Sequence, residues 1–287
     1  MTTLDHKIDF AVVLSVSKAN PNGDPLNGNR PRQNYDGHGE ISDVAIKRKI
    51  RNRLMDMDES IFVQSNDNRS DNFNSLKERA EANTELDKIM KSKKGSNEEF
   101  ARIACQQWLD VRSFGQVFAF KEKSKGAGVS VGIRGPVSVR TATSIDPIDI
   151  TSMQITKSVN SETGDKKGSD TMGMKHRVDF GVYVFYGSIN TQLAEKTGFT
   201  NKDADKMKQA LVTLFENDAS SARPDGSMEV NNVYWWEHNS KLGQYSSAKV
   251  HRSLEVKSKN EEPKSFADYE FKLHELDGLK VEIIDGL

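Results

Sequence analysis

The sequence predicts a single α+β domain that carries large insertions. The chain has 287 residues, of which 35% are hydrophobic, with 20 glycines in addition. This length and composition allow one large hydrophobic core and exclude a disordered chain. Short β-branched runs alternate along the chain with segments of helical periodicity. The fold class therefore follows from composition and from the order in which these segments occur.

The first elements are a strand, a shaped loop and a helix. Residues 10–16 are apolar and β-branched and stop at a loop, as a buried central strand does. The loop at 20–31 is rich in Asn, Gly, Asp and Pro, which favour specific turns. Ser42 is placed to cap a helix. Its apolar face holds Ile46, Ile50, Leu54 and Met57. A basic ridge on the adjoining face is predicted from Lys47, Arg48 and Arg51.

The middle of the chain predicts a surface insertion and two strand pairs. Residues 66–97 are polar, with a helix expected around 76–90, and we interpret them as an insertion at the surface. A helical pattern resumes at 98–109. Strands are expected at 117–120 and 129–133, around a turn that contains Lys121, Lys123 and Lys125. A protruding hairpin is expected from two β-compatible arms, 148–156 and 172–178, around the polar tip 161–168.

The last elements complete the predicted fold. Residues 180–186 are dense in Val, Phe and Tyr and predict a strand. A capping-box pattern at 200–203 begins a helix. The stripe of that helix is Ala204, Met207, Leu211, Leu214 and Phe215. Asp277-Gly278 predicts a closing hairpin between 269–273 and 279–284. The order strand, helix, strand pair, strand, helix, strand fits a ferredoxin-like core with insertions.

The charges balance over the whole chain but are separated locally. There are 41 Lys and Arg against 42 Asp and Glu. Residues 30–53 hold seven basic and three acidic residues, 110–140 hold six and two, and 255–285 hold nine acidic and five basic residues. Basic side chains beside Asn- and Gly-rich loops suit a phosphodiester backbone. Alternatively, these basic residues bind no phosphate and belong to a solvated helix face and to ordinary surface turns.

The sequence matches none of the enzymatic motifs considered below and contains no candidate membrane segment. The glycines fit neither a P-loop nor a dinucleotide fingerprint, and no histidine pair has zincin spacing, so no cofactor and no metal are expected. The single Cys105 excludes an internal disulfide and lies in an apolar stretch, where a buried inert thiol is expected. No apolar run is long enough for a membrane helix and no signal region is recognised. A cytoplasmic protein without a membrane partner is expected.

Apolar and aromatic residues offer two further hypotheses. Flexible apolar side chains on the protruding hairpin could act as a wedge that unstacks bases, as minor-groove wedges do. The candidates are Met153, Ile155, Met172 and Met174. The alternative is that they pack against one another or against a neighbouring subunit. Bases can stack on aromatic rings, but for Tyr234, Trp235 and Trp236 a core or interface position is favoured, and for His238 a structural role.

Several motifs together resemble a known family. The sequence NPNGDP at 20–25 is followed by GNRPR at 28–32 and by ISDVAIKRKIRN at 41–52. Further matches are DVRSFG at 110–115, RGPV at 134–137, Ser144-Ile145, TGF at 197–199 and DASSAR at 218–223. The chain resembles, from its first strand to about residue 238, the backbone subunit of the CRISPR Cascade complex of subtype I-C, in the RAMP superfamily.

The resemblance implies a fold shaped like a right hand. The whole chain, 1–287, would be one RRM-like palm domain with two insertions. Helical fingers would occupy 60–110, and a β-hairpin thumb would occupy 148–178. Several copies would polymerise along the spacer of the CRISPR RNA, each thumb displacing one base of the guide. The remaining bases would stay available for pairing with target DNA in antiviral defence.

The resemblance also implies site residues and partners. The residues expected to hold or line the RNA path are Asn22, Gly23, Asn27, Arg30, Arg32, Ser42, Lys47, Arg48 and Arg51, with Arg134 and Arg140 as further candidates. The expected partners are CRISPR RNA, target DNA paired with the guide, and further copies of the chain. The other Cascade subunits are also expected, namely the processing or cap subunit, the large subunit and the small subunits, together with a helicase-nuclease that the complex recruits.

One enzymatic alternative stays open. Related backbone subunits of type III complexes cut RNA with an aspartate in the loop after the first strand, and Asp24 lies in such a loop here. The chain would then be a metal-dependent endoribonuclease. We expect no catalysis, because the resemblance is to type I and because an aspartate between Gly23 and Pro25 is explained as a turn former.

Overall fold

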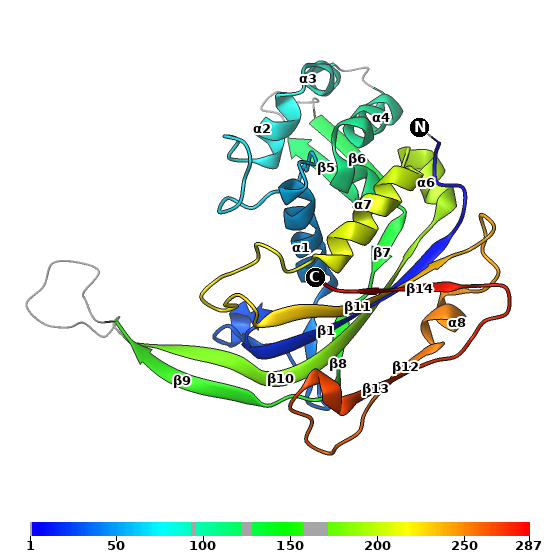
Figure 1. Ribbon diagram of the computed structural model, residues 1–287. Helices are drawn as coiled ribbons and strands as arrows, with labels where there is room; N and C mark the ends of the chain where they lie inside the picture. The colour runs from blue at the N-terminus through cyan, green and yellow to red at the C-terminus, as the bar shows by residue number, and fades with distance from the viewer. Residues whose placement is uncertain (1, 93–95, 122–127, 158–171) are drawn as a thin grey trace, which may run out of the picture.

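The computed structural model describes residues 2–92, 96–121, 128–157 and 172–287 (Figure 1). Its centre is a large antiparallel sheet. From one edge to the other the strands are β14 (Val281–Asp285), β11 (Met228–Glu237), β1 (Ile8–Ala19), β10 (Met172–Ile189), β8 (Ala142–Pro147) and β4 (His38–Ile41). Two further strands, β7 (Val137–Val139) and β9 (Ile150–Thr156), also pair with β10. The chain therefore has a mixed α/β fold built on one sheet.

Strand β1 is the central strand that the sequence predicts. Its residues from Ile8 to Val16 are buried, and it pairs antiparallel with β10 on one side and β11 on the other. Phe10 lies opposite Gly187 and Trp235. A Cβ atom at Gly187 would lie 2.1 Å from the Phe10 ring. The sheet accommodates this phenylalanine only because the opposite residue has no side chain.

Both faces of the sheet are covered. Helices α1 (Asp43–Asp56), α6 (Thr191–Thr197) and α7 (Asn201–Val212) contribute to the core that contains Phe10, Val12 and Leu14. The opposite face, with Ala11 and Val13, is covered by α8 (Ser247–His251) and by a small sheet. That sheet is formed by β12 (Leu254–Ser258) and β13 (Tyr269–Leu273), with a 3-10 turn, Phe266–Asp268, before β13.

The helix starts are where the sequence predicts them. The Ser42 hydroxyl accepts a hydrogen bond from the backbone N–H of Ala45 and begins α1. Thr200 and Asp203 form the predicted capping box of α7. Helices α5 and α6 lie in stretches where the sequence analysis expected none. Both are short, and a single turn or two gives no periodic pattern.

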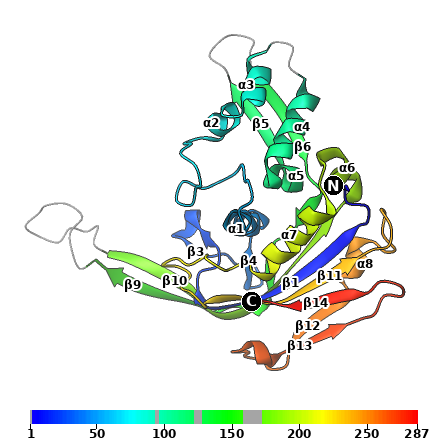
Figure 2. The same cartoon turned by 45° about the horizontal axis from the view of Figure 1, so that its top comes forward.

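A second hydrophobic cluster stands beyond α1 and α7 (Figure 2). Its elements are α2 (Leu76–Glu81), α3 (Thr84–Lys91), α4 (Asn97–Gln107), α5 (Leu109–Phe114), β5 (Gly115–Lys121) and β6 (Gly128–Arg134). The Phe118 ring lies 4.9 Å from Phe62 and 5.0 Å from Phe100, centroid to centroid. The segment 66–97 was expected to lie at the surface. This is wrong for Leu86 and Met90, which are buried in this cluster. The expected helix at 76–90 is interrupted where Asn83 caps α3.

The two clusters are joined by buried ion pairs. The Asp110 carboxylate is 1% exposed and accepts hydrogen bonds from the backbone N–H groups of Phe62 (2.7 Å) and Val63 (3.1 Å) and from Nε of Arg51 (3.0 Å). Arg112 forms a two-pronged pair with Asp203 at 2.8 and 3.1 Å. The motif at 110–115 is therefore structural: its charged side chains fasten the second cluster to α1 and α7.

The C-terminal hairpin expected around Asp277-Gly278 is wrong. The chain does turn there, with Gly278 at a φ of 70°. However, β13 pairs with β12, and β14 pairs with β11 at the edge of the main sheet. The two segments face different partners because Tyr269 packs on the face covered by the small sheet, whereas β14 extends the ladder of the buried strand β11. Among the described residues, no helix is long and apolar enough to cross a membrane.

Replacing Asp110 tests how the two clusters are joined. Asp110→Ala leaves the Arg51 guanidinium and two backbone N–H groups without their acceptor, so we expect a loss of about 3–5 kcal/mol in the free energy of unfolding. Asp67→Ala removes the partner of exposed Arg48 and is expected to cost less than about 1 kcal/mol. Urea unfolding of both variants makes the comparison. Equal losses would show that the Asp110 contacts do not stabilise the fold.

Candidate nucleic-acid interface

The loop after β1 is compact and internally bonded. It contains β2 (Gly23–Asp24), the 3-10 turn Pro25–Asn27 and β3 (Arg30–Pro31). Asp24 caps the turn, because its Oδ1 accepts from the backbone N–H of Leu26 at 3.2 Å. Gly28 and Asn29 adopt left-handed φ values of 57° and 61°. A Cβ at Gly23 would lie 2.2 Å from the Asn29 side chain. The loop therefore requires its glycines and asparagines for its shape.

This loop is fastened to the start of α1. The Asn22 Oδ1 accepts from the backbone N–H of Ser42 at 2.9 Å, and the backbone N–H of Arg32 donates to the Asn22 carbonyl at 3.1 Å. The Ser42 hydroxyl is itself engaged as the helix cap. Asn22 and Ser42 thus fix the position of the loop against the helix, whatever else they contact.

The predicted basic ridge of α1 is not one row of solvent-facing cations. Lys47 pairs with Asp43 at 3.1 Å and is partly buried. Arg48 is 54% exposed and pairs with the exposed Asp67 at 3.0 Å. Arg51 is turned inward: its Nε donates to buried Asp110 and its guanidinium lies 5.1 Å from the Phe114 ring centroid. The helical wheel places the three together but does not show that the second cluster covers Arg51.

A polar groove of about 530 Å³ lies between the loop, α1 and a second loop at 217–223. Cationic and amide side chains dominate its lining, and two aspartates are present. The lining residues are Pro21, Asn22, Gly23, Ala45, Arg48, Lys49, Asn52, Asp67, Asn68, Asn217, Asp218, Ala219, Ser220 and Arg223. Three of the motifs singled out in the sequence, at 20–25, 41–52 and 218–223, therefore meet at one groove.

The sequence alone assigns no role to the loop at 217–223, although residues 218–223 belong to a motif of the resemblance. The structure holds it to α1 through Asp218, which contacts Lys49 and also accepts from Nε of Arg223 at 3.1 Å. The backbone N–H of Asn20 donates to the Ala222 carbonyl at 2.9 Å and ties this loop to the first one. Lys49 was not predicted as a site residue because its position on the wheel borders the apolar stripe.

The first loop also contacts the hairpin formed by β9 and β10. Arg30 Nη1 donates to the Ser152 hydroxyl at 2.9 Å, and Ser152 is hydrogen-bonded to Nδ1 of His176 at 2.8 Å. Asn27 is exposed, and the Arg32 side chain makes a long contact of 3.4 Å with Asp24. A smaller cavity of about 280 Å³ lies at this junction. Its lining residues are Asn20, Gly28, Asn29, Ile155, Met174, Lys175, His176, Ser221 and Ala222.

The hairpin projects from the body of the molecule (Figures 1 and 2), and its register divides the predicted wedge. Met174 lies opposite Gln154, and Met172 lies opposite Thr156, whereas Ile155 lies opposite Gly173 and Met153 opposite Lys175. Directly opposed residues share a face. Met172 and Met174 are thus on one face, Met153 and Ile155 on the other, and the four do not form a single wedge. Ile155, Met172 and Met174 are about half exposed or more. The expected tip, 161–168, lies outside the described residues.

The two remaining cationic candidates do not line the groove. Arg134 is exposed at the end of β6, opposite Gly115. Arg140 is exposed, and its charge acts on Tyr186 and His251, which lie on the face of the sheet opposite α1. The Lys123 and Lys125 positions and the Lys121 side chain lie outside the described part of the chain. The structure therefore places Arg134 and Arg140 away from the groove.

The aromatic run and His238 are internal, as favoured. Tyr234, Trp235 and Trp236 are at most 4% exposed. Nε2 of His238 contacts the fully buried Asp9 at 2.9 Å, and its Nδ1 accepts from the backbone N–H of Gln244. Burial opposes ionisation of Asp9, but hydrogen bonds from His238, Ser247 and Lys7 outweigh it and lower the pKa of this carboxyl.

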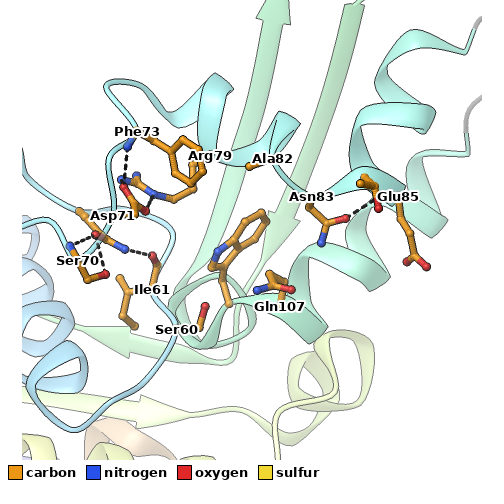
Figure 3. A pocket seen from close by; sticks show the side chains of 13 residues that line it. Ser60, Ile61, Ser70, Asp71, Phe73, Arg79, Ala82, Asn83, Glu85 and Gln107 are labelled. Atoms are coloured by element: carbon orange, nitrogen blue, oxygen red, sulfur yellow. Dashed lines mark hydrogen bonds and ion pairs between the residues drawn. The ribbon is translucent and has the colours of Figure 1, made fainter.

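Cys105 and the polar residues of a third cavity have structural roles. Cys105 is buried, and burial raises the pKa of its thiol to about 11. A cavity of about 510 Å³ lies in the second cluster (Figure 3). Arg79 in its wall donates to both oxygens of Asp71 and to the carbonyl of Phe62. Asn83 is engaged in capping α3. These polar groups have partners within the chain. Across the described ranges, no group of three or more His, Cys, Asp or Glu side chains is arranged to hold a metal ion.

Comparisons with known proteins identify the family. The family model described as CRISPR-associated protein Cas7 matches residues 6–274. A curated relative from Haloferax volcanii, "CRISPR-associated protein Cas7", is 25% identical over 234 residues, which are 77% of this chain and 67% of the relative. The chain belongs to the CRISPR-associated protein Cas7 family.

Two solved structures align with parts of this chain. A chain of a "CRISPR RNA-guided surveillance complex, pre-nicking" aligns with a TM-score of 0.46 and 13% identity, over 80% of this chain and 78% of that one. A chain of a "CRISPR RNA-guided surveillance complex" aligns with a TM-score of 0.42 and 14% identity, over 80% and 68%.

Proposed function

We propose that this chain is the CRISPR RNA-binding backbone subunit of a Cascade surveillance complex of type I-C. In this proposal it polymerises along the spacer of the guide and presents the guide for pairing with target DNA. The observation that carries the proposal is the convergence of three sequence motifs of this family member on one polar groove. The groove offers Arg48, Arg223 and a set of amides to a chain of phosphates.

The chemistry of the groove suits backbone binding without sequence readout. Phosphate contacts position a nucleic acid, and Watson–Crick pairing of the guide supplies the specificity of a guided complex. The exposed pair of Arg48 with Asp67 contributes little to stability, so a phosphate can replace the aspartate at small cost. Asn22, Gly23 and Ser42 would shape this path, and Arg30 would link it to the hairpin. Arg51 holds Asp110 and is left out of the proposed contacts.

In this proposal the fold divides into the parts of a hand. The order β11-β1-β10-β8, with α1 after β1 and α7 between β10 and β11, supports a ferredoxin-like palm. The second cluster would be the fingers and would extend beyond 60–110 to Phe118 and Val131. The hairpin within 148–178 would be the thumb, with either Met172 and Met174 or Met153 and Ile155 facing the RNA. Further partners in this proposal are copies of the chain, the other Cascade subunits and the recruited helicase-nuclease.

Removing Lys47 and Arg48, the two cations of the predicted ridge that pair with no buried carboxylate among the described residues, tests the phosphate contacts. For Lys47→Ala combined with Arg48→Ala, we expect weaker RNA binding and a shallower dependence of log K on log salt. The slope should fall by about 0.7 for each phosphate that the variant no longer binds, or about 1.4 if both cations bind one. Fluorescence anisotropy with single-stranded RNA of two unrelated sequences measures both slopes.

The matched control for this experiment removes the same charge elsewhere. Lys272→Ala with Lys280→Ala changes two exposed lysines on the β13 side of the molecule, away from the groove. This variant should keep the wild-type slope. If the α1 variant also keeps it, Lys47 and Arg48 face solvent only, and the groove is not the RNA path.

We further propose that the chain has no nuclease activity. Asp24 is occupied as the cap of the Pro25–Asn27 turn and contacts Arg32, which explains the residue without catalysis. Incubation of the assembled complex with complementary RNA and Mg²⁺ should give no products. Regularly spaced cleavage that disappears in Asp24→Ala would instead establish the endoribonuclease alternative.

A further inference from the structure

Lys49 is a buried lysine at the base of the RNA groove. Its side chain is only 7% exposed, yet it lines the groove beside Arg48 and Asn52. Its ammonium contacts the Asp218 carboxylate and lies 5.4 Å from the centroid of the Phe215 ring. A lysine this deeply buried is retained only with a charged partner, and Asp218 is that partner.

Among the described residues, the charged groups that act most strongly on Lys49 come from two elements. Arg48 belongs to the same helix, whereas Asp218 and Arg223 belong to the 217–223 loop. Asp218 is shared, since it contacts Lys49 and accepts from Nε of Arg223. Arg48 is paired with Asp67, so three cations, Lys49, Arg48 and Arg223, face two carboxylates, Asp218 and Asp67. This arrangement leaves an excess of positive charge directed at the groove, which an anion in the groove would offset.

We propose that Lys49 is a positioning residue for the RNA backbone, and that RNA binding is coupled to its protonation. In its charged form it holds Asp218, and so keeps the 217–223 loop and the Arg223 guanidinium at the groove. When Lys49 is neutral, Asp218 is neutralised by Arg223 alone, and Arg223 becomes less available to a phosphate. This inference rests on the proposed binding of RNA in the groove and adds a regulation by pH.

The direction of the coupling follows from burial. Desolvation lowers the pKa of Lys49 from 10.5 to about 8, with Asp218 opposing the shift and Arg223 and Arg48 adding to it. A phosphodiester in the groove adds negative charge and favours the protonated form. The free protein thus loses the proton as pH rises through about 8, whereas the complex keeps it. RNA affinity must therefore fall as pH rises through that range.

The test is a pH profile of RNA affinity with three forms of the protein. The probe is a single-stranded RNA of adenine and cytosine only, whose bases do not titrate near pH 8. For the wild type, Kd should increase by up to about tenfold between about pH 7 and pH 9 at constant ionic strength. Lys49→Arg keeps its charge throughout this range and should bind with a nearly flat profile. Lys49→Met should bind weakly and with a flat profile at every pH.

Controls separate the inference from a structural effect and from the proposed function. Lys272→Arg, on β13 and away from the groove, should retain the wild-type pH profile. Thermal unfolding of each variant shows whether it is folded. If the larger arginine side chain in Lys49→Arg prevents folding, Lys49→Met serves as the variant that is compared with the wild type. A wild-type profile that is flat, or that stays unchanged in Lys49→Arg, overturns the inference while RNA binding stands. If the wild type binds no RNA at either pH, it is the proposed function that fails.

Discussion

The pairing of β1 between β10 and β11 is the constraint on which the rest of the structure depends. A strand buried from Ile8 to Val16 must be covered on both faces, and it is, by α1 and α7 on one side and by α8, β12 and β13 on the other. Because β1 ends at Ala19, the loop that follows begins beside the start of α1 and the 217–223 loop. The groove is thus a consequence of where the central strand stops.

Elements with a strong local signal were predictable from the sequence. Strand β1 is an apolar β-branched run, and α1 and α7 begin at Ser42 and Thr200, whose caps are short-range interactions. The first loop and the helix beside it were also recognisable as one surface, because both lie in a single stretch of chain. Residue type and spacing contain this information without any tertiary contact.

Features set by distant parts of the chain were not predictable. Arg48 and Arg51 are three residues apart on α1, yet one faces the groove and the other is covered by Asp110 of the second cluster. The partners of β13 and β14 depend on which sheet each segment reaches, not on the turn between them. Likewise, Lys49 gains its ion pair from Asp218, which is 169 positions away in the sequence. Helical periodicity and turn chemistry are local properties of the sequence, so they do not predict such contacts.

The central claim is that copies of this chain assemble side by side on one RNA through the groove. The most direct measurement is the mass of the complexes formed on guides of two spacer lengths, by native mass spectrometry or light scattering. A backbone subunit predicts that the number of bound copies increases in proportion to the length of the spacer. One copy per RNA at both lengths would contradict the account and identify an RNA-binding module that acts as a monomer.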